Sequence, residues 1–135
     1  MTAEGLVKAE LVAFCYDEAV ASGDVNSMLA IACVIKNRVD RGFGDWLDVL
    51  FNAGTISAHE FGPTKKLDLG NGNLTTLMRE VEDIYHGVFL DEFTDKCVYY
   101  CFVERPIRDW FAKHIIQRPQ DHPQTATVGT MKLYK

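Results

Sequence analysis

Residues 24–42, DVNSMLAIACVIKNRVDRG, decide the fold because they describe a complete helix with its start and stop signals. Apolar residues recur there at spacings of four, three and four, which is one face of an α-helix: Met28, Ala32, Ile35 and Val39. Asp24 has the side chain of an N-cap, and Gly42 follows the last turn, where helices commonly end. The stretch therefore predicts a helix between Asp24 and Gly42.

Three more segments show helical periodicity. Residues 6–21 carry an apolar stripe that ends in a carboxylate: Leu11, Phe14, Cys15 and Glu18. Residues 45–52 predict a short helix with Asp45 as its cap, and residues 74–88 predict a longer one. Residues 54–73 lack periodicity and are rich in glycine, so we expect a functional or mobile loop there.

The remaining segments indicate a little β-structure. Residues 97–103, rich in valine and aromatic side chains, predict a short strand. Pro106 can open a last short helix. Residues 126–134 predict a closing hairpin or an extended strand. The fold class we expect is mainly α with a small β element (α+β), in a single domain over residues 1–135.

Length, charge and hydropathy restrict the classes of function. The chain has 135 residues, of which 47% are apolar and 24% charged, as in a soluble globular protein. A net charge of -5 argues against nucleic acid as a partner, because phosphate binding needs a basic surface. No apolar run approaches the length of a membrane span, and the first residues have no signal-peptide pattern. We therefore expect a protein made in a cytoplasm.

Four cysteines allow disulfide or metal interpretations. Cys15 and Cys33 fall on apolar stripes, where a free thiol packs as a small hydrophobic group. Cys97 and Cys101 are four residues apart, which is not a familiar zinc spacing, and the histidines are scattered. We expect reduced cysteines, no metal site and no cofactor.

Glu18 is the main candidate for a catalytic group. It lies on an apolar face, where burial favours the protonated form, and near a helix C-terminus, where the macrodipole acts in the same direction. A carboxylic acid with a raised pKa can protonate a leaving oxygen near neutral pH. The alternative is that Glu18 reaches the helix edge and pairs with Lys36 or Arg38.

Four blocks of the sequence also form a pattern together: YDEAVASG at residues 16–23, AIACVIKNRV at 30–39, His86-Gly87 with Asp95 and CVYY at 97–100, and Trp110-Phe111 with VGTMKLY at 128–134. In order and spacing they resemble the cell-wall hydrolase family of spore cortex-lytic enzymes and phage lysins. The resemblance covers nearly the whole chain, and the Asn-Arg-Val block is its most specific part.

This resemblance implies a lysozyme-like fold and an activity that cuts peptidoglycan between N-acetylmuramic acid and N-acetylglucosamine. Family members act as lytic transglycosylases that rely on one glutamate, a role that falls on Glu18. Residues 54–73 would form one wall of the cleft. A phage or prophage origin is then expected, with release of the protein from the cytoplasm or packaging in a virion, and with glycan strands or virion proteins as partners.

The chain also departs from the family pattern. Val20, Ala21 and Ser22 replace the residues that usually follow Glu-Ala, including a second glutamate, and Thr130 or Met131 stands where the closing block usually has histidine. These departures and the acidic charge keep a second hypothesis open, a non-catalytic phage structural or interaction protein derived from the same fold. A third is a small helical interaction domain with no connection to glycans.

Further residues are candidates for binding the substrate. Tyr99, Tyr100 and Tyr134 could stack on pyranose rings, although large aromatic residues more often pack in a core. If residues 97–103 are a strand, Tyr99 and Tyr100 point to opposite faces. His59 and Glu60 in the long loop could contact substrate, and Glu60 could supply a second carboxylate. Trp110 is interpreted as structural.

Overall fold

The computed structural model describes residues 2–22, 24–56 and 70–135. Its elements follow in this order: α1 (Ala3–Ala19), the 3₁₀ turn η1 (Val20–Ser22), α2 (Val25–Asp40), α3 (Trp46–Ile56), α4 (Gly72–His86), β1 (Tyr99–Phe102), α5 (Asp109–Phe111), the π-helical turn η2 (Ala112–Ile116), β2 (Gln124–Val128) and β3 (Met131–Tyr134). The described chain is thus mainly helical with a small antiparallel sheet, as the sequence predicts at this coarse level.

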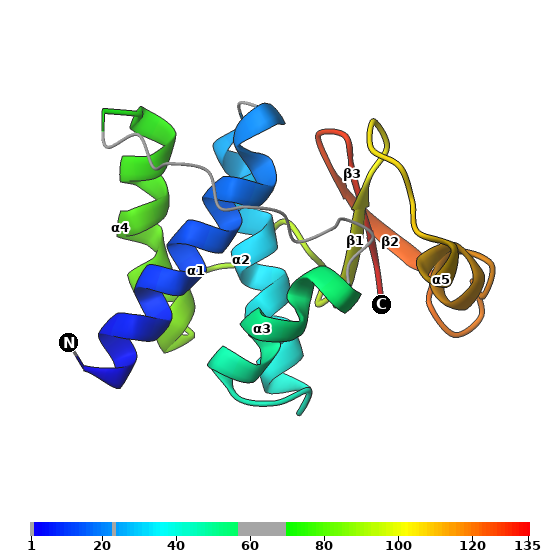
Figure 1. The fold of residues 1–135 in the computed structure, drawn as a ribbon, viewed down its shortest axis with the longest axis horizontal. Helices are drawn as coiled ribbons and strands as arrows, with labels where there is room; N and C mark the ends of the chain where they lie inside the picture. Colours follow the sequence, from blue (N-terminus) through cyan, green and yellow to red (C-terminus); the bar gives the residue numbers. More distant parts are fainter. Residues whose placement is uncertain (1, 23, 57–69) are drawn as a thin grey trace.

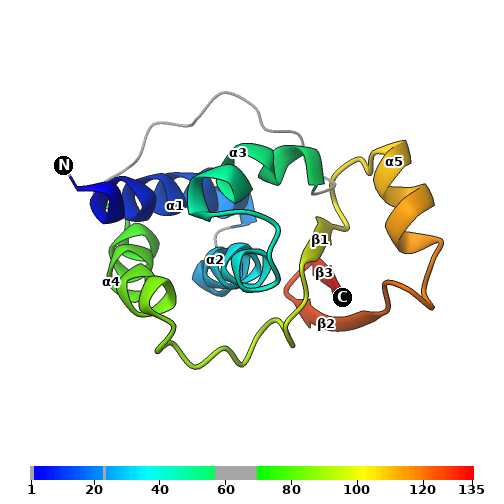
Figure 2. The ribbon, with the colours of Figure 1, turned by 90° about the horizontal axis from the view of Figure 1, so that it is seen from below.

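Helix α2 is the centre of the fold. Residues 27–35 are all buried, and the helix packs against α1, α3 and α4 (Figure 1). Figure 2 views α2 nearly end-on, with α4 on one side and the sheet on the other. Its predicted start is confirmed, because the Asp24 side chain accepts a hydrogen bond from the Asn26 N–H at 2.9 Å. A helix surrounded on so many sides must be apolar around most of its circumference, and this one is.

The other helices differ from the prediction mainly at their ends. Helix α1 begins earlier than predicted, at Ala3, because the Thr2 hydroxyl caps the Gly5 N–H at 3.0 Å. Helix α3 continues four residues past the predicted end, to Ile56. Helix α4 starts at Gly72 under an Asn71 cap and stops at Gly87, whose φ of 75° ends the helix in the left-handed region.

The sheet has the strand order β1-β3-β2, with both pairs antiparallel. Strands β2 and β3 form the predicted hairpin, and β1 lies within the predicted strand. The prediction that Pro106 opens the last helix is wrong. Helix α5 begins at Asp109 after an N-cap at Arg108, so Pro106 precedes both.

The sheet separates two apolar clusters. Tyr100 and Phe102 of β1 belong to the main core with the helices. Cys101 and Tyr134 point to the other face, where they pack with residues of α5 and η2. Both views place α5 beyond the sheet, away from α2 (Figures 1 and 2). Within the part of the chain described, no helix combines the length and the hydropathy that crossing a membrane requires.

Candidate functional site

Glu18 lies in the last turn of α1 and is 3% exposed. Its burial among apolar groups raises the pKa of its carboxyl from 4.5 to about 7, because desolvation disfavours the charged form. Asp17 acts in the same direction, whereas Arg105, Tyr100 and Arg38 oppose it, in decreasing order of effect. Desolvation exceeds the opposing interactions, so the acid form predominates up to near-neutral pH.

Arg105 forms an ion pair with Glu18. Its Nη2 donates to the backbone carbonyl of Glu18 at 2.5 Å, and its Nη1 lies 3.5 Å from the carboxyl Oε2. The guanidinium Cζ lies over the Phe102 ring, 4.0 Å from the centroid. Arg105 therefore contacts both the backbone and the side chain of Glu18 from the turn that follows β1.

The Glu18 carboxyl also faces β1, through Tyr100. This tyrosine is fully buried, and the interaction of its side chain with the Glu18 carboxyl lowers the pKa of that group and so favours the carboxylate. The guanidinium of Arg38, from α2, lies 5.9 Å from the Tyr100 ring centroid. Residues from α1, α2, β1 and the turn after β1 thus meet at one buried carboxyl group.

The Asn-Arg pair of α2 holds the segment that enters β1. Asn37 donates to the Thr94 hydroxyl at 3.0 Å and to the Cys97 carbonyl at 2.9 Å. Arg38, itself fully buried, donates through Nε to the Val98 carbonyl at 2.6 Å. Burial lowers the pKa of Arg38 to about 10, so the guanidinium stays charged near neutral pH. These bonds place β1, and with it Tyr100, against the end of α1.

The sequence suggested Lys36 or Arg38 as the partner of Glu18, and the structure adds a third cation. Lys36 pairs with Asp40 at 2.5 Å, and Arg38 is the weakest of the three influences that lower the Glu18 pKa. The cation at 3.5 Å is Arg105, 87 residues further along the chain. No periodicity in the sequence identifies Arg105 as a site residue. The only sequence feature that could have indicated it is its position just after a predicted strand.

The predicted tyrosines do not lie together. Tyr99 and Tyr134 are opposite each other in the β1–β3 register and share the face that packs on Phe111, at centroid distances of 6.5 and 5.8 Å. Tyr100 points to the other face, toward Glu18. The structure therefore brings Tyr100 to Glu18 and places Tyr99 and Tyr134 across the sheet from it.

Other candidates have different positions. His59 and Glu60 lie outside the described residues. Trp110 is 47% exposed and its ring lies tilted against that of His114, at a centroid distance of 5.6 Å, whereas its neighbour Phe111 is fully buried. In α5 the structural role expected of Trp110 belongs to Phe111.

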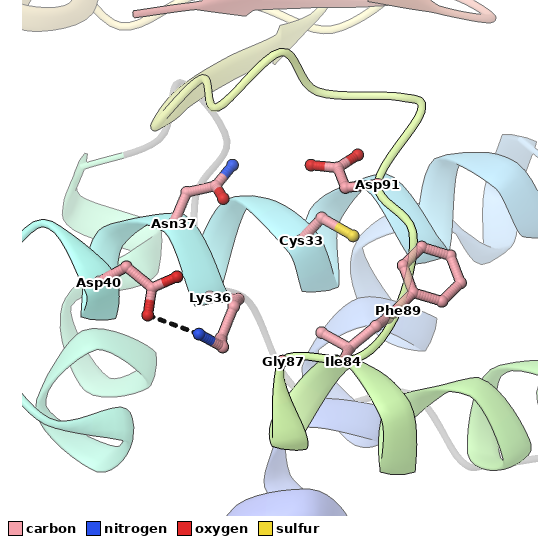
Figure 3. A pocket seen from close by; sticks show the side chains of 8 residues that line it. All are labelled: Cys33, Lys36, Asn37, Asp40, Ile84, Gly87, Phe89 and Asp91. Carbon is pink, nitrogen blue, oxygen red and sulfur yellow. Dashed lines mark hydrogen bonds and ion pairs between the residues drawn. The ribbon is translucent and has the colours of Figure 1, made fainter.

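A separate hollow of about 130 Å³ lies between α2 and the end of α4 (Figure 3). Its polar groups are already engaged: Lys36 with Asp40, Asn37 with the loop before β1, and Asp91 with Thr94. Glu18 is not among the residues that line it: Cys33, Lys36, Asn37, Asp40, Ile84, Gly87, Phe89 and Asp91.

The cysteines are free thiols, and all four are buried. Burial raises the pKa of each thiol, most strongly for Cys15 and Cys33, so none is activated as a nucleophile. Within residues 2–22, 24–56 and 70–135, no three histidine, cysteine or acidic side chains are grouped closely enough to hold a metal ion.

Comparisons of the chain with models of protein families, with curated proteins and with solved structures return no match. The site is therefore interpreted from its own geometry and from the sequence blocks described above.

Proposed function

We propose that the protein is a lysozyme-like, peptidoglycan-degrading enzyme, a lytic transglycosylase or a muramidase-like glycosidase, of phage or prophage origin. Glu18 is its acid and base. The observation that carries the proposal is a buried carboxyl group whose pKa is raised to about 7 at the end of α1. The resemblance of residues 16–23 and 30–39 to the cell-wall hydrolase family supports the same residue.

The proposed reaction needs one carboxyl group. Neutral Glu18 gives its proton to the glycosidic oxygen between N-acetylmuramic acid and N-acetylglucosamine, and the C1–O bond breaks through an oxocarbenium-like state. The resulting Glu18 carboxylate then takes the proton of the muramyl 6-hydroxyl as that oxygen bonds to C1. The product is a 1,6-anhydro ring, and Glu18 returns to its acid form. Because the acid form starts the reaction, the rate should fall as pH rises above about 7.

Digestion of purified peptidoglycan, with mass spectrometry of the products, tests this proposal. The wild type should release anhydro-muropeptides, and Glu18→Gln should release none, because glutamine cannot transfer the proton. Glu10→Gln is the matched control, since Glu10 is an exposed carboxylate on the same helix. Reducing-end products would keep the glycosidase and require a second carboxylate, for which Glu60 is the first candidate.

A second function is favoured by one specific contact. The Arg105–Glu18 ion pair is also what a non-catalytic phage structural or interaction protein would use to join α1 to β1. That protein would bind virion components instead of glycan. Folded wild type that leaves walls from several bacteria undigested, as Glu18→Gln does, would reject the enzyme and leave this alternative.

A further inference from the structure

The end of α1 presents two acceptors to the same arginine. A helix leaves its last carbonyls without intrahelical partners, and Glu18 is the penultimate residue of α1. Arg105 Nη2 binds this carbonyl at 2.5 Å, while Nη1 lies 3.5 Å from Oε2 of the same residue. One planar guanidinium thus spans the backbone and the side chain of Glu18, a geometry that the fork of an arginine permits.

The guanidinium is itself held in place. Its Cζ lies over the Phe102 ring, 4.0 Å from the centroid, so the guanidinium rests on a fully buried ring of β1. The Arg105 N–H donates to the Phe102 carbonyl at 3.2 Å, which closes the turn that returns the side chain along the strand. Arg105 is therefore also held by contacts with Phe102 of β1, outside α1.

We infer that Arg105 is the positioning residue of Glu18. It fixes the direction of the carboxyl group. Its positive charge also faces the carboxylate that forms when the acid gives up its proton. This inference rests on the proposed function of the same site. In the acid step the charge stabilises the new carboxylate. In the base step the fixed direction keeps the same oxygen within reach of the muramyl hydroxyl.

Several charged or titratable groups face Glu18, and Arg105 is the strongest of those that favour its carboxylate. They come from α1, α2, β1 and the turn after β1: Cys15, Asp17, Arg38, Tyr100 and Arg105. Removal of Arg105 should therefore raise the pKa of Glu18 above about 7. A residue that only capped the helix carbonyl would leave this pKa unchanged.

The test is a ¹³C NMR titration of the Glu18 carboxyl carbon, assigned by its loss in Glu18→Gln, combined with the pH profile of peptidoglycan digestion. Arg105→Gln should raise the Glu18 pKa by about one unit and move the alkaline limb of the profile to higher pH. Arg118→Gln, which removes an exposed arginine, should change neither. An unchanged Glu18 titration in folded Arg105→Gln would overturn the inference.

Arg105→Lys separates charge from geometry. Lysine keeps the charge but lacks the planar fork, so the Glu18 titration should stay close to that of the wild type while digestion slows about tenfold. Digestion at the wild-type rate by this variant would overturn the two-point contact. It also serves if Arg105→Gln does not fold.

The two proposals fail in different ways. Digestion by the wild type with an unmoved titration in Arg105→Gln rejects the inference and leaves the proposed function intact. A moved titration without digestion by the wild type rejects the enzyme and supports Arg105 as the residue that holds Glu18 in a non-catalytic protein.

Discussion

At the scale of single residues, the folded protein binds a proton at Glu18 that the unfolded chain releases. The carboxyl is 3% exposed, and its pKa is about 7, compared with 4.5 for an ordinary glutamate. Between these two pH values the native state binds more protons than the unfolded state, so the free energy of unfolding falls as pH rises. Above about pH 7 the ionised group destabilises the fold by about 3 kcal/mol.

We therefore expect Glu18→Gln to stabilise the protein at alkaline pH. Glutamine has nearly the shape of the neutral acid and cannot ionise, so the variant should gain up to about 3 kcal/mol over the wild type at pH 8 and little at pH 4. Urea unfolding at both pH values measures the difference. Glu10→Gln, at an exposed position of α1, should change stability by less than about 0.5 kcal/mol at either pH. A gain from Glu18→Gln that is equal at pH 4 and pH 8 would contradict the titration described here.

At the scale of elements, two consecutive residues of α2 hold β1. We expect Asn37→Ala to lower the free energy of unfolding by about 1–3 kcal/mol, because the Cys97 carbonyl and the Thr94 hydroxyl both lose a donor. Chemical denaturation checks this value. Asn52→Ala is the matched control: Asn52 is exposed and donates to the Asp48 carbonyl of its own helix, so its loss should be nearly neutral. Equal effects of the two substitutions would mean that Asn37 does not hold the strand.

The helices could be predicted from the sequence because local signals specify them. Asp24 caps α2, and the stripe ending in Glu18 is buried as its spacing predicts. The predicted ends of the helices were less accurate: α3 runs to Ile56, and Pro106 does not open α5.

Contacts between residues far apart in the sequence were not predictable. Nothing local relates Arg105 to Glu18, or shows that Tyr100 and not Tyr99 lies near the acid. Those relations depend on how β1 packs against α1 and α2.

At the scale of the whole molecule, the sheet lies between two apolar clusters of unequal size. The smaller one depends on Phe111, which is fully buried and makes edge contacts with Tyr99 and Tyr134. We expect Phe111→Ala to cost about 3–5 kcal/mol, as large-to-small changes of buried aromatics do. Thermal and urea unfolding measure the loss. Trp110→Ala is the adjacent control and should cost less than about 1 kcal/mol, because its side chain is 47% exposed. A Trp110→Ala loss as large as that of Phe111→Ala would show that the exposed ring supports the fold.

Strand order has a consequence for synthesis of the chain. The ribosome delivers residues from the N-terminus, so α1, α2 and β1 emerge well before residues 131–134. Strand β1 pairs with β3 in the sheet, and β3 is the last of the described elements to be synthesised. The backbone groups of β1 that bond to β3 therefore have no strand partner until then. The pairing that completes the sheet beside Tyr100 and the turn bearing Arg105 therefore becomes available only after translation has passed Tyr134. A nascent chain carries the acid long before it carries a completed site.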